Sequence, residues 1–227
     1  MKLPYITKGG WGHISISANK ENAISYEIST SGGNGSTCEL SGQMQFDKSK
    51  SDFSDEGKKC SVDFKILDNA ITVSSRPAQE CQMLVCGARA TFNGVYIRVL
   101  PQCESKMRGN AKMIFLNLYK TGNYQTASKI LEDLLSSCEI ILDRQELGRI
   151  KNDLAITRYH LNDFTGCLQS LEPYLKDADL SDAEIMEKYG YDAVFADIQL
   201  GIVKSVRTNK KLCSDGLDHL QVPPKIH

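Results

Sequence analysis

Residues 119–135 read YKTGNYQTASKILEDLL, and residues 159–175 read YHLNDFTGCLQSLEPYL. The two stretches align at a shift of 40 residues. Their matched positions are Tyr124 with Phe164, Ala127 with Cys167, Leu131 with Leu171, and Leu135 with Leu175. Apolar residues recur in both stretches at steps of three and four, which is the spacing of an amphipathic helix. Each copy therefore predicts a helix, a tight turn and a second helix, with a small residue where the second helix approaches the first.

The first copy resembles the tetratricopeptide repeat (TPR), because Gly122, Tyr124 and Ala127 meet its pattern of glycine, aromatic residue and alanine. The second copy has Asn162 at the glycine place and Cys167 at the alanine place, so we describe the array as TPR-like. Two repeats alone leave an apolar face open. A third helical stretch over residues 182–211 is expected to cap the array through Met186, Tyr189, Val194, Ile198, Ile202 and Val206.

Between residues 12 and 100 the apolar period is two, which sends alternate side chains to one face of a sheet. Ile14 and Ile16, for example, alternate with serines. About seven or eight short strands, separated by turn residues, predict an antiparallel barrel or sandwich. We expect a strand at residues 87–92 and a mobile loop at residues 47–59.

The change of period near Cys103 predicts a domain boundary. The chain is expected to be α+β, with residues 1–105 forming a disulfide-tied antiparallel β domain. Residues 106–227 are expected to form a TPR-like α-helical domain.

Eight cysteines are spread over the whole chain, at Cys38, Cys60, Cys81, Cys86, Cys103, Cys138, Cys167 and Cys213. None lies in a CxxC motif or has a histidine at metal-ligand spacing, so we expect no metal. Their even number favours up to four disulfides and an oxidising compartment. Proximity along the chain predicts the pairs Cys38 with Cys60, Cys81 with Cys86, Cys103 with Cys138, and Cys167 with Cys213. The alternative is a cytosolic protein with buried thiols.

The charge balance is nearly even, with 27 basic and 28 acidic residues. No long-range field therefore favours nucleic acid or an anionic membrane surface. No run approaches the roughly 20 apolar residues of a membrane span, which predicts a soluble protein. Met1–Tyr5 lacks the pattern of a signal segment, so an exported protein would here be a mature form with an added methionine.

Catalytic motifs are missing from the sequence. Its four histidines, at His13, His160, His219 and His227, form no motif. A turn separates His160 from Cys167, so a nucleophilic Cys–His pair is not expected. The glycine-rich run Ser31–Gly35 lacks the spacing of a phosphate-binding loop. We therefore expect a protein that is not an enzyme and uses no cofactor.

Two features are candidate partner-binding elements. Trp11 lies among glycines, which free the backbone to present a large ring as an interface anchor. The alternative is that this ring plugs one end of a small barrel. The turn formed by Ser31, Gly33, Asn34 and Gly35 is the second candidate.

Residues 80–103, ECQMLVCGARATFNGVYIRVLPQC, resemble the C-CGxRAxFxGxY pattern of exported bacterial proteins described as lysozyme-inhibitor-like. Residues 148–168, GRIKNDLAITRYHLNDFTGCL, and Val206–Cys213 resemble the helical half that accompanies it in Gram-negative periplasmic proteins. The resemblance implies a periplasmic location and inhibition by inserting a loop into a hydrolase cleft. Ser41 and Gly42 begin the SGxxY loop of such inhibitors, but Gln45 replaces its tyrosine, which argues against lysozyme as the target.

These observations favour a non-enzymatic periplasmic binding protein with a protein partner. It would inhibit a cell-wall hydrolase or a secreted effector toxin, as an inhibitor or immunity protein. The alternative is a TPR-like adaptor or scaffold in envelope assembly. A third class, an enzyme of unfamiliar type, would have to use acidic residues because histidine is scarce.

Overall fold

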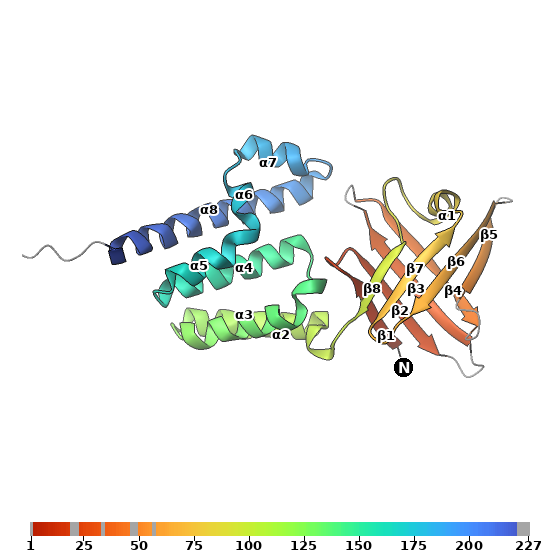
Figure 1. Cartoon of the computed structure of the whole chain (residues 1–227), viewed down its shortest axis with the longest axis horizontal. Helices are drawn as coiled ribbons and strands as arrows, with labels where there is room; N and C mark the ends of the chain where they lie inside the picture. Colours follow the sequence, from red (N-terminus) through yellow and green to blue (C-terminus); the bar gives the residue numbers. More distant parts are fainter. Residues whose placement is uncertain (1, 19–22, 33–34, 46–49, 56–57, 222–227) are drawn as a thin grey trace, which may run out of the picture. The chain divides into compact units, whose positions relative to one another are not determined.

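The computed structural model describes residues 2–18, 23–32, 35–45, 50–55 and 58–221. The chain forms two compact units. The first contains Met1–Leu100 and Ile140–Asp143, and the second contains Pro101–Glu139 and Arg144–His227. The first unit is an antiparallel sheet and the second is helical, so the predicted α+β fold is confirmed (Figure 1).

In the described part of the first unit there are eight strands. They are β1 (Lys2–Thr7), β2 (Gly12–Ala18), β3 (Ala23–Ser31), β4 (Thr37–Gln45), β5 (Lys50–Asp55), β6 (Lys58–Ile66), β7 (Ala70–Arg76) and β8 (Gly94–Arg98). Their order in the sheet is β4-β3-β2-β1-β8-β7-β6-β5, and every pairing is antiparallel. The end strands β4 and β5 also contact each other. The sheet therefore curls into a nearly closed barrel (Figure 1).

The predicted alternation sets the register of the strands. Tyr5 pairs with Ile14, Ile14 with Ile28, and Ile28 with Leu40. All four side chains are buried, so they form one apolar row across β1, β2, β3 and β4. A slip of one residue would turn such a row toward water, which is why this register is strongly specified.

A helix, α1 (Ala78–Val85), connects β7 to β8 and contacts β4, β6 and β7. Cys60 on β6 is bonded to Cys81 on α1, and Cys38 on β4 is bonded to Cys86 just after the helix. The predicted pairs Cys38 with Cys60 and Cys81 with Cys86 are therefore wrong. The physical reason is that α1 packs across several strands and presents its two cysteines to different ones.

Three further sequence expectations for this unit are corrected. Lys50–Asp55 is the strand β5, although the sequence predicted a mobile loop at residues 47–59. Residues 46–49 and 56–57 lie outside the described residues. The predicted alternation begins at residue 12 and so leaves out β1; in the structure Pro4 pairs with Ser15, and its carbonyl accepts a hydrogen bond from the backbone N–H of Val99.

Residues 87–92 are not a strand. Ala90 and Phe92 are buried, which explains the strand-like alternation of the sequence. Side chains satisfy the backbone carbonyls of this segment in place of a neighbouring strand. Thr30 Oγ1 donates to Thr91 O at 2.9 Å, and Tyr96 Oη donates to Phe92 O at 2.7 Å.

Seven α-helices form the second unit over the residues that the structure describes, which end at residue 221. They are α2 (Ser105–Lys120), α3 (Tyr124–Cys138), α4 (Arg144–His160), α5 (Phe164–Leu171), α6 (Leu175–Ala178), α7 (Asp182–Tyr189) and α8 (Ala193–Gln221). The predicted repeat appears as the two helix pairs α2–α3 and α4–α5. The predicted third stretch is divided between α7 and α8.

The two turns of the repeat have the same geometry. Gly122 and Asn162 occupy equivalent positions, with φ angles of 76° and 58°. The following residues, Asn123 and Asp163, cap α3 and α5 by accepting a hydrogen bond from the backbone N–H three residues later. Glycine and asparagine are the residues that best tolerate a left-handed conformation, so the substitution at the glycine place preserves the turn.

Helix α8 completes the array by packing against both α4 and α5. It occupies the place where a third repeat would put its first helix. The Cys167–Cys213 disulfide joins α5 to α8, and Cys103–Cys138 joins the start of the unit to α3. These two pairs were predicted correctly from the sequence.

Removal of the Cys38–Cys86 disulfide is expected to destabilise the barrel. Replacing Cys38 and Cys86 together by serine should lower the free energy of unfolding by about 3–4 kcal/mol, because a closed loop of 48 residues is released. Urea unfolding followed by the fluorescence of Trp11, the single tryptophan, measures this change in the β unit. The control is the double serine variant of Cys103 and Cys138, which should leave the Trp11 transition in place. Peptide mapping of the unreduced protein must also recover Cys38 linked to Cys86.

The repeat turns provide a matched pair of variants. A Cβ added at Gly122 meets no atom within 4 Å, so Gly122→Ala changes only the conformational energy of the turn. We expect it to lower the free energy of unfolding by about 1 kcal/mol, whereas Asn162→Gly should be neutral or slightly stabilising. Urea unfolding followed by far-UV circular dichroism measures both. An equal loss in the two variants would contradict the equivalence of the turns.

Candidate functional site

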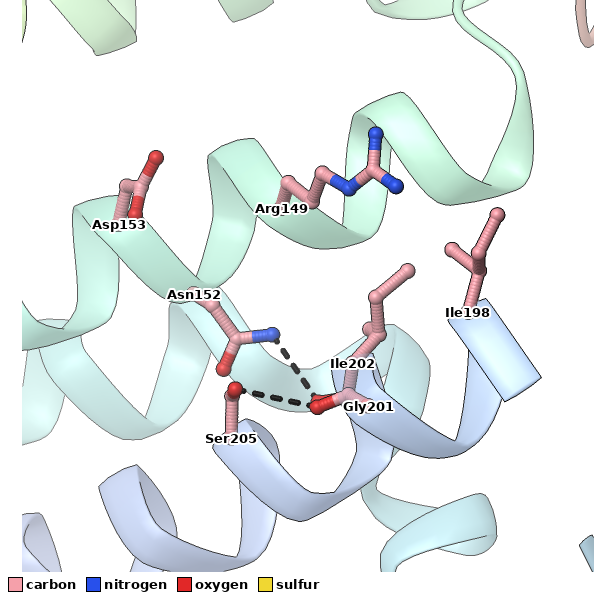
Figure 2. Close-up of a pocket in the computed structure, with 7 residues that line it drawn as sticks. All are labelled: Arg149, Asn152, Asp153, Ile198, Gly201, Ile202 and Ser205. Atoms are coloured by element: carbon pink, nitrogen blue, oxygen red, sulfur yellow. Dashed lines mark hydrogen bonds between the residues drawn. The ribbon is translucent and has the colours of Figure 1, made fainter.

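A cavity of about 330 Å³ lies between α4 and α8 (Figure 2). Its lining residues are Arg149, Asn152 and Asp153 from α4, and Ile198, Gly201, Ile202 and Ser205 from α8. These helices are the first helix of the second repeat and the helix in the corresponding third position. The cavity therefore belongs to the face that first helices share, which is a common binding surface of helical repeat proteins.

Glycines set the spacing between the two helices. A Cβ at Gly148 would lie 2.8 Å from Cγ2 of Ile202, so α4 and α8 approach closely there. A Cβ at Gly201 would meet nothing within 4 Å, which marks the open side of the cavity. The two helices are therefore in close contact at Gly148, and the space beside that contact is open at Gly201.

Asn152 fixes the inner wall of the cavity. Its Nδ2 donates to Ile202 O at 3.4 Å (Figure 2) and to Gly148 O at 3.0 Å, and its Oδ1 accepts from Asn209 Nδ2 at 3.0 Å. Ser205 donates to Gly201 O at 3.1 Å. Because these polar groups are engaged within the protein, they make a rigid wall.

The two charged residues of the cavity, Arg149 and Asp153, differ from Asn152 and Ser205 in that their charged groups are not hydrogen-bonded. Among the described residues, no hydrogen bond or ion pair is made by the side chain of Arg149 or by the carboxylate of Asp153. Figure 2 shows both side chains projecting from the same side of α4, one turn apart. Burial raises the pKa of Asp153 to about 6, while Lys112 on α2 acts in the opposite direction. Asp153 is therefore a partly buried carboxylate without a direct partner in the described chain.

The carboxylate of Asp177, in contrast, has several partners within the protein. The Asp177 carboxylate is buried and accepts hydrogen bonds from Arg144, Lys188 and Tyr189 at 2.6–2.7 Å. Burial alone would raise the pKa of Asp177, but these hydrogen bonds outweigh it and lower the value. This cluster holds α4, α6 and α7 together and offers no open position to a ligand atom.

A second hollow, of about 290 Å³, is lined mainly by residues of α2 and α3. It is lined by Gln102, Met107, Asn110, Ala111, Ile114, Ile130, Asp133, Leu134, Ser137 and Cys138. Met107 and Ile114 are each about half exposed, at 46% and 51%. This hollow is mainly apolar and lacks the opposed charges of the α4–α8 cavity.

The predicted partner-binding residues Trp11 and Ser31 lie side by side in the barrel. The backbone N–H of Ser31 donates to Trp11 O at 2.8 Å. The partly buried Trp11 ring packs on Tyr96, with 6.3 Å between the ring centroids. The backbone N–H of Gly35 donates to Gly32 O at 3.0 Å. The predicted site residues Gly33 and Asn34 lie outside the described residues. The contact with Tyr96 suits an end plug, and partner binding by these residues stays a prediction.

The eight cysteines and His160 have partners within the protein. All eight cysteines are disulfide-bonded, so Cys167 is not a free nucleophile. His160 stacks on Tyr124 at 4.4 Å, and its Nε2 is 3.1 Å from Tyr119 Oη. Within residues 2–18, 23–32, 35–45, 50–55 and 58–221, no group of three or more His, Cys, Asp or Glu side chains is arranged to hold a metal ion.

Comparison with known proteins finds no match among family models, curated proteins or solved structures. The resemblance to lysozyme-inhibitor-like proteins therefore stays a prediction. Among the described helices, none is long and apolar enough to cross a membrane. Four disulfides fit an extracytoplasmic protein, since they persist in oxidising compartments.

Arg149 and Asp153 were not among the binding residues predicted from the sequence. Their spacing of four residues on a predicted helix is also typical of a solvated face. The available signal was their position on the first helix of a repeat, which faces the shared surface. Recognising the site also required the position of α8, which only the structure provides.

The raised pKa predicts a pH-dependent effect on stability. Because the folded state holds the Asp153 proton more tightly than the unfolded chain, this group favours folding at pH 4 and loses that contribution as pH rises through about 6. Asp153→Asn should therefore stabilise the protein by about 1–2 kcal/mol at pH 8 and have little effect at pH 4. Urea unfolding at both pH values measures this. A loss of stability at both would contradict the assignment.

Proposed function

We propose that this chain is a non-enzymatic periplasmic binding protein that inhibits a cell-wall hydrolase or a secreted effector toxin. The helical unit engages an exposed segment of that protein on the face shared by α2, α4 and α8. The observation that carries the proposal is the α4–α8 cavity, where the side chains of Asp153 and Arg149 make no hydrogen bond or ion pair with the described residues. Charges held in this way are stabilised when a partner supplies the opposite charge.

The scaffold around the cavity supports this role. Disulfides and buried polar networks hold α4, α5 and α8 in fixed positions. A surface that is already ordered loses less conformational entropy on binding, which favours affinity. Trp11 and Ser31, adjacent in the barrel unit, provide a second candidate contact for the same partner.

The second candidate function is an adaptor or scaffold in envelope assembly. The apolar hollow on α2 and α3 favours it, because the helical unit then has two separate surfaces of different chemistry. An adaptor must hold two components at once, whereas an inhibitor needs one contact surface.

Affinity capture tests the proposed function. The full disulfide-bonded chain, immobilised and exposed to periplasmic extract and to purified wall hydrolases and effector toxins, should retain one of them and reduce its activity stoichiometrically. Changing Arg149 and Asp153 together to alanine should weaken that complex by about tenfold or more. Asp215→Ala, an exposed carboxylate of α8 outside the cavity, is the matched control.

The outcomes separate the candidate functions. Retention of wall-synthesis or secretion components without inhibition would favour the adaptor. Failure to retain any hydrolase or toxin would contradict the inhibitor. Trp11→Ala should weaken the complex more than it lowers the free energy of unfolding if the barrel also contacts the partner; equal losses would support the end-plug interpretation of Trp11.

A further inference from the structure

The α4–α8 cavity is lined by charged residues from α4 and by apolar residues from α8. The backbone positions of Asp153 and Arg149 lie one helical turn apart on α4, about 6 Å along the helix axis. Ile198 and Ile202 supply apolar surface from α8. Figure 2 shows Ile198 and Ile202 toward the Arg149 end of the cavity, away from Asp153. A ligand that fits this arrangement carries a cation at the Asp153 end, and an anion beside apolar surface at the Arg149 end.

The carboxylate of Asp153 indicates that the ligand group beside it carries a positive charge. Asp153 is partly withdrawn from water, and Lys112 acts on it electrostatically without a hydrogen bond or ion pair between the two side chains. The other titratable group that interacts with it electrostatically is Tyr119 of α2, and the lining residues of α8 carry no charge. A cation placed beside Asp153 would therefore provide the counter-charge that the fold itself does not place in direct contact.

The volume limits the size of the occupant. About 330 Å³ is at the lower end of the roughly 300–1,000 Å³ typical of small-ligand pockets. Such a space accepts one long side chain and excludes a folded element. The compact ammonium of lysine suits a single carboxylate, whereas a guanidinium favours a planar, two-point partner.

We propose that the α4–α8 cavity binds a lysine residue of the partner protein. The ammonium group of that lysine pairs with Asp153, its methylene stem extends along the cavity toward the isoleucine side chains at the other end, and a carboxylate of the same segment pairs with Arg149. This inference rests on the proposed function in that the ligand belongs to a protein, and it specifies the chemistry that the helical unit recognises.

The direct test uses Nα-acetyl-L-lysine, which carries the ammonium, stem and carboxylate in one small molecule. Titrated into the full disulfide-bonded chain with labelled isoleucine methyl groups, it should cause saturable NMR shifts at Ile198 and Ile202. Nα-acetyl-norleucine keeps the stem and carboxylate but lacks the ammonium, so it should bind at least about tenfold more weakly. Equal binding of the two compounds, or no shift with acetyl-lysine, would overturn the proposal.

Variants locate the contact. Asp153→Asn should weaken acetyl-lysine binding about tenfold, and Arg149→Ala should remove the preference for acetyl-lysine over its amide, which lacks the carboxylate. Asp215→Asn should leave both properties unchanged. Binding to the unchanged protein should strengthen between pH 5 and pH 7.5, as the Asp153 carboxylate ionises, and Asp153→Asn should abolish that dependence. Unaltered binding in Asp153→Asn would refute the assignment.

The two proposals fail in distinguishable ways. Acetyl-lysine binding without capture of any hydrolase or toxin would retain the lysine site and overturn the inhibitor function. Capture of such a protein by a chain that does not bind acetyl-lysine would retain the function and overturn the lysine site.

Discussion

The pair of disulfides around α1 is the constraint on which the barrel depends. In the sheet order, β4 is one end strand and β6 is next to the other, yet Cys38 on β4 and Cys60 on β6 are both linked to the short segment 81–86. These links bring the two ends of the sheet to one helix. An open sheet would expose unpaired backbone groups along β4 and β5, and curling the sheet brings these end strands together.

In the helical unit the equivalent constraint is local. The left-handed residue in each turn and the cap that follows it fix where the second helix starts, and Ala127 and Cys167 allow it to approach the first. Helix α8 then uses the surface that the second repeat presents. The cavity arises where α8 separates from α4 beside the close contact at Gly148, so the packing of the array creates the candidate site.

Patterns that depend on near neighbours were predictable from the sequence. The repeat was found because Gly122 and Asn162 lie within segments whose apolar spacing is regular, and most strands were found because their alternation is regular. Features set by distant residues were not predictable. Residues 87–92 alternate like a strand, but Thr30 and Tyr96 take up their carbonyls. The Cys38–Cys86 bond and the partly buried state of Asp153 likewise depend on elements far away in the sequence.

The distribution of sulfur bonds has one further consequence. Cys38, Cys60, Cys81 and Cys86 pair within the first unit, and Cys103, Cys138, Cys167 and Cys213 pair within the second. Oxidative maturation of either unit therefore requires no thiol from the other. During biosynthesis the four N-terminal cysteines can therefore complete their native bonds before the last helix has emerged.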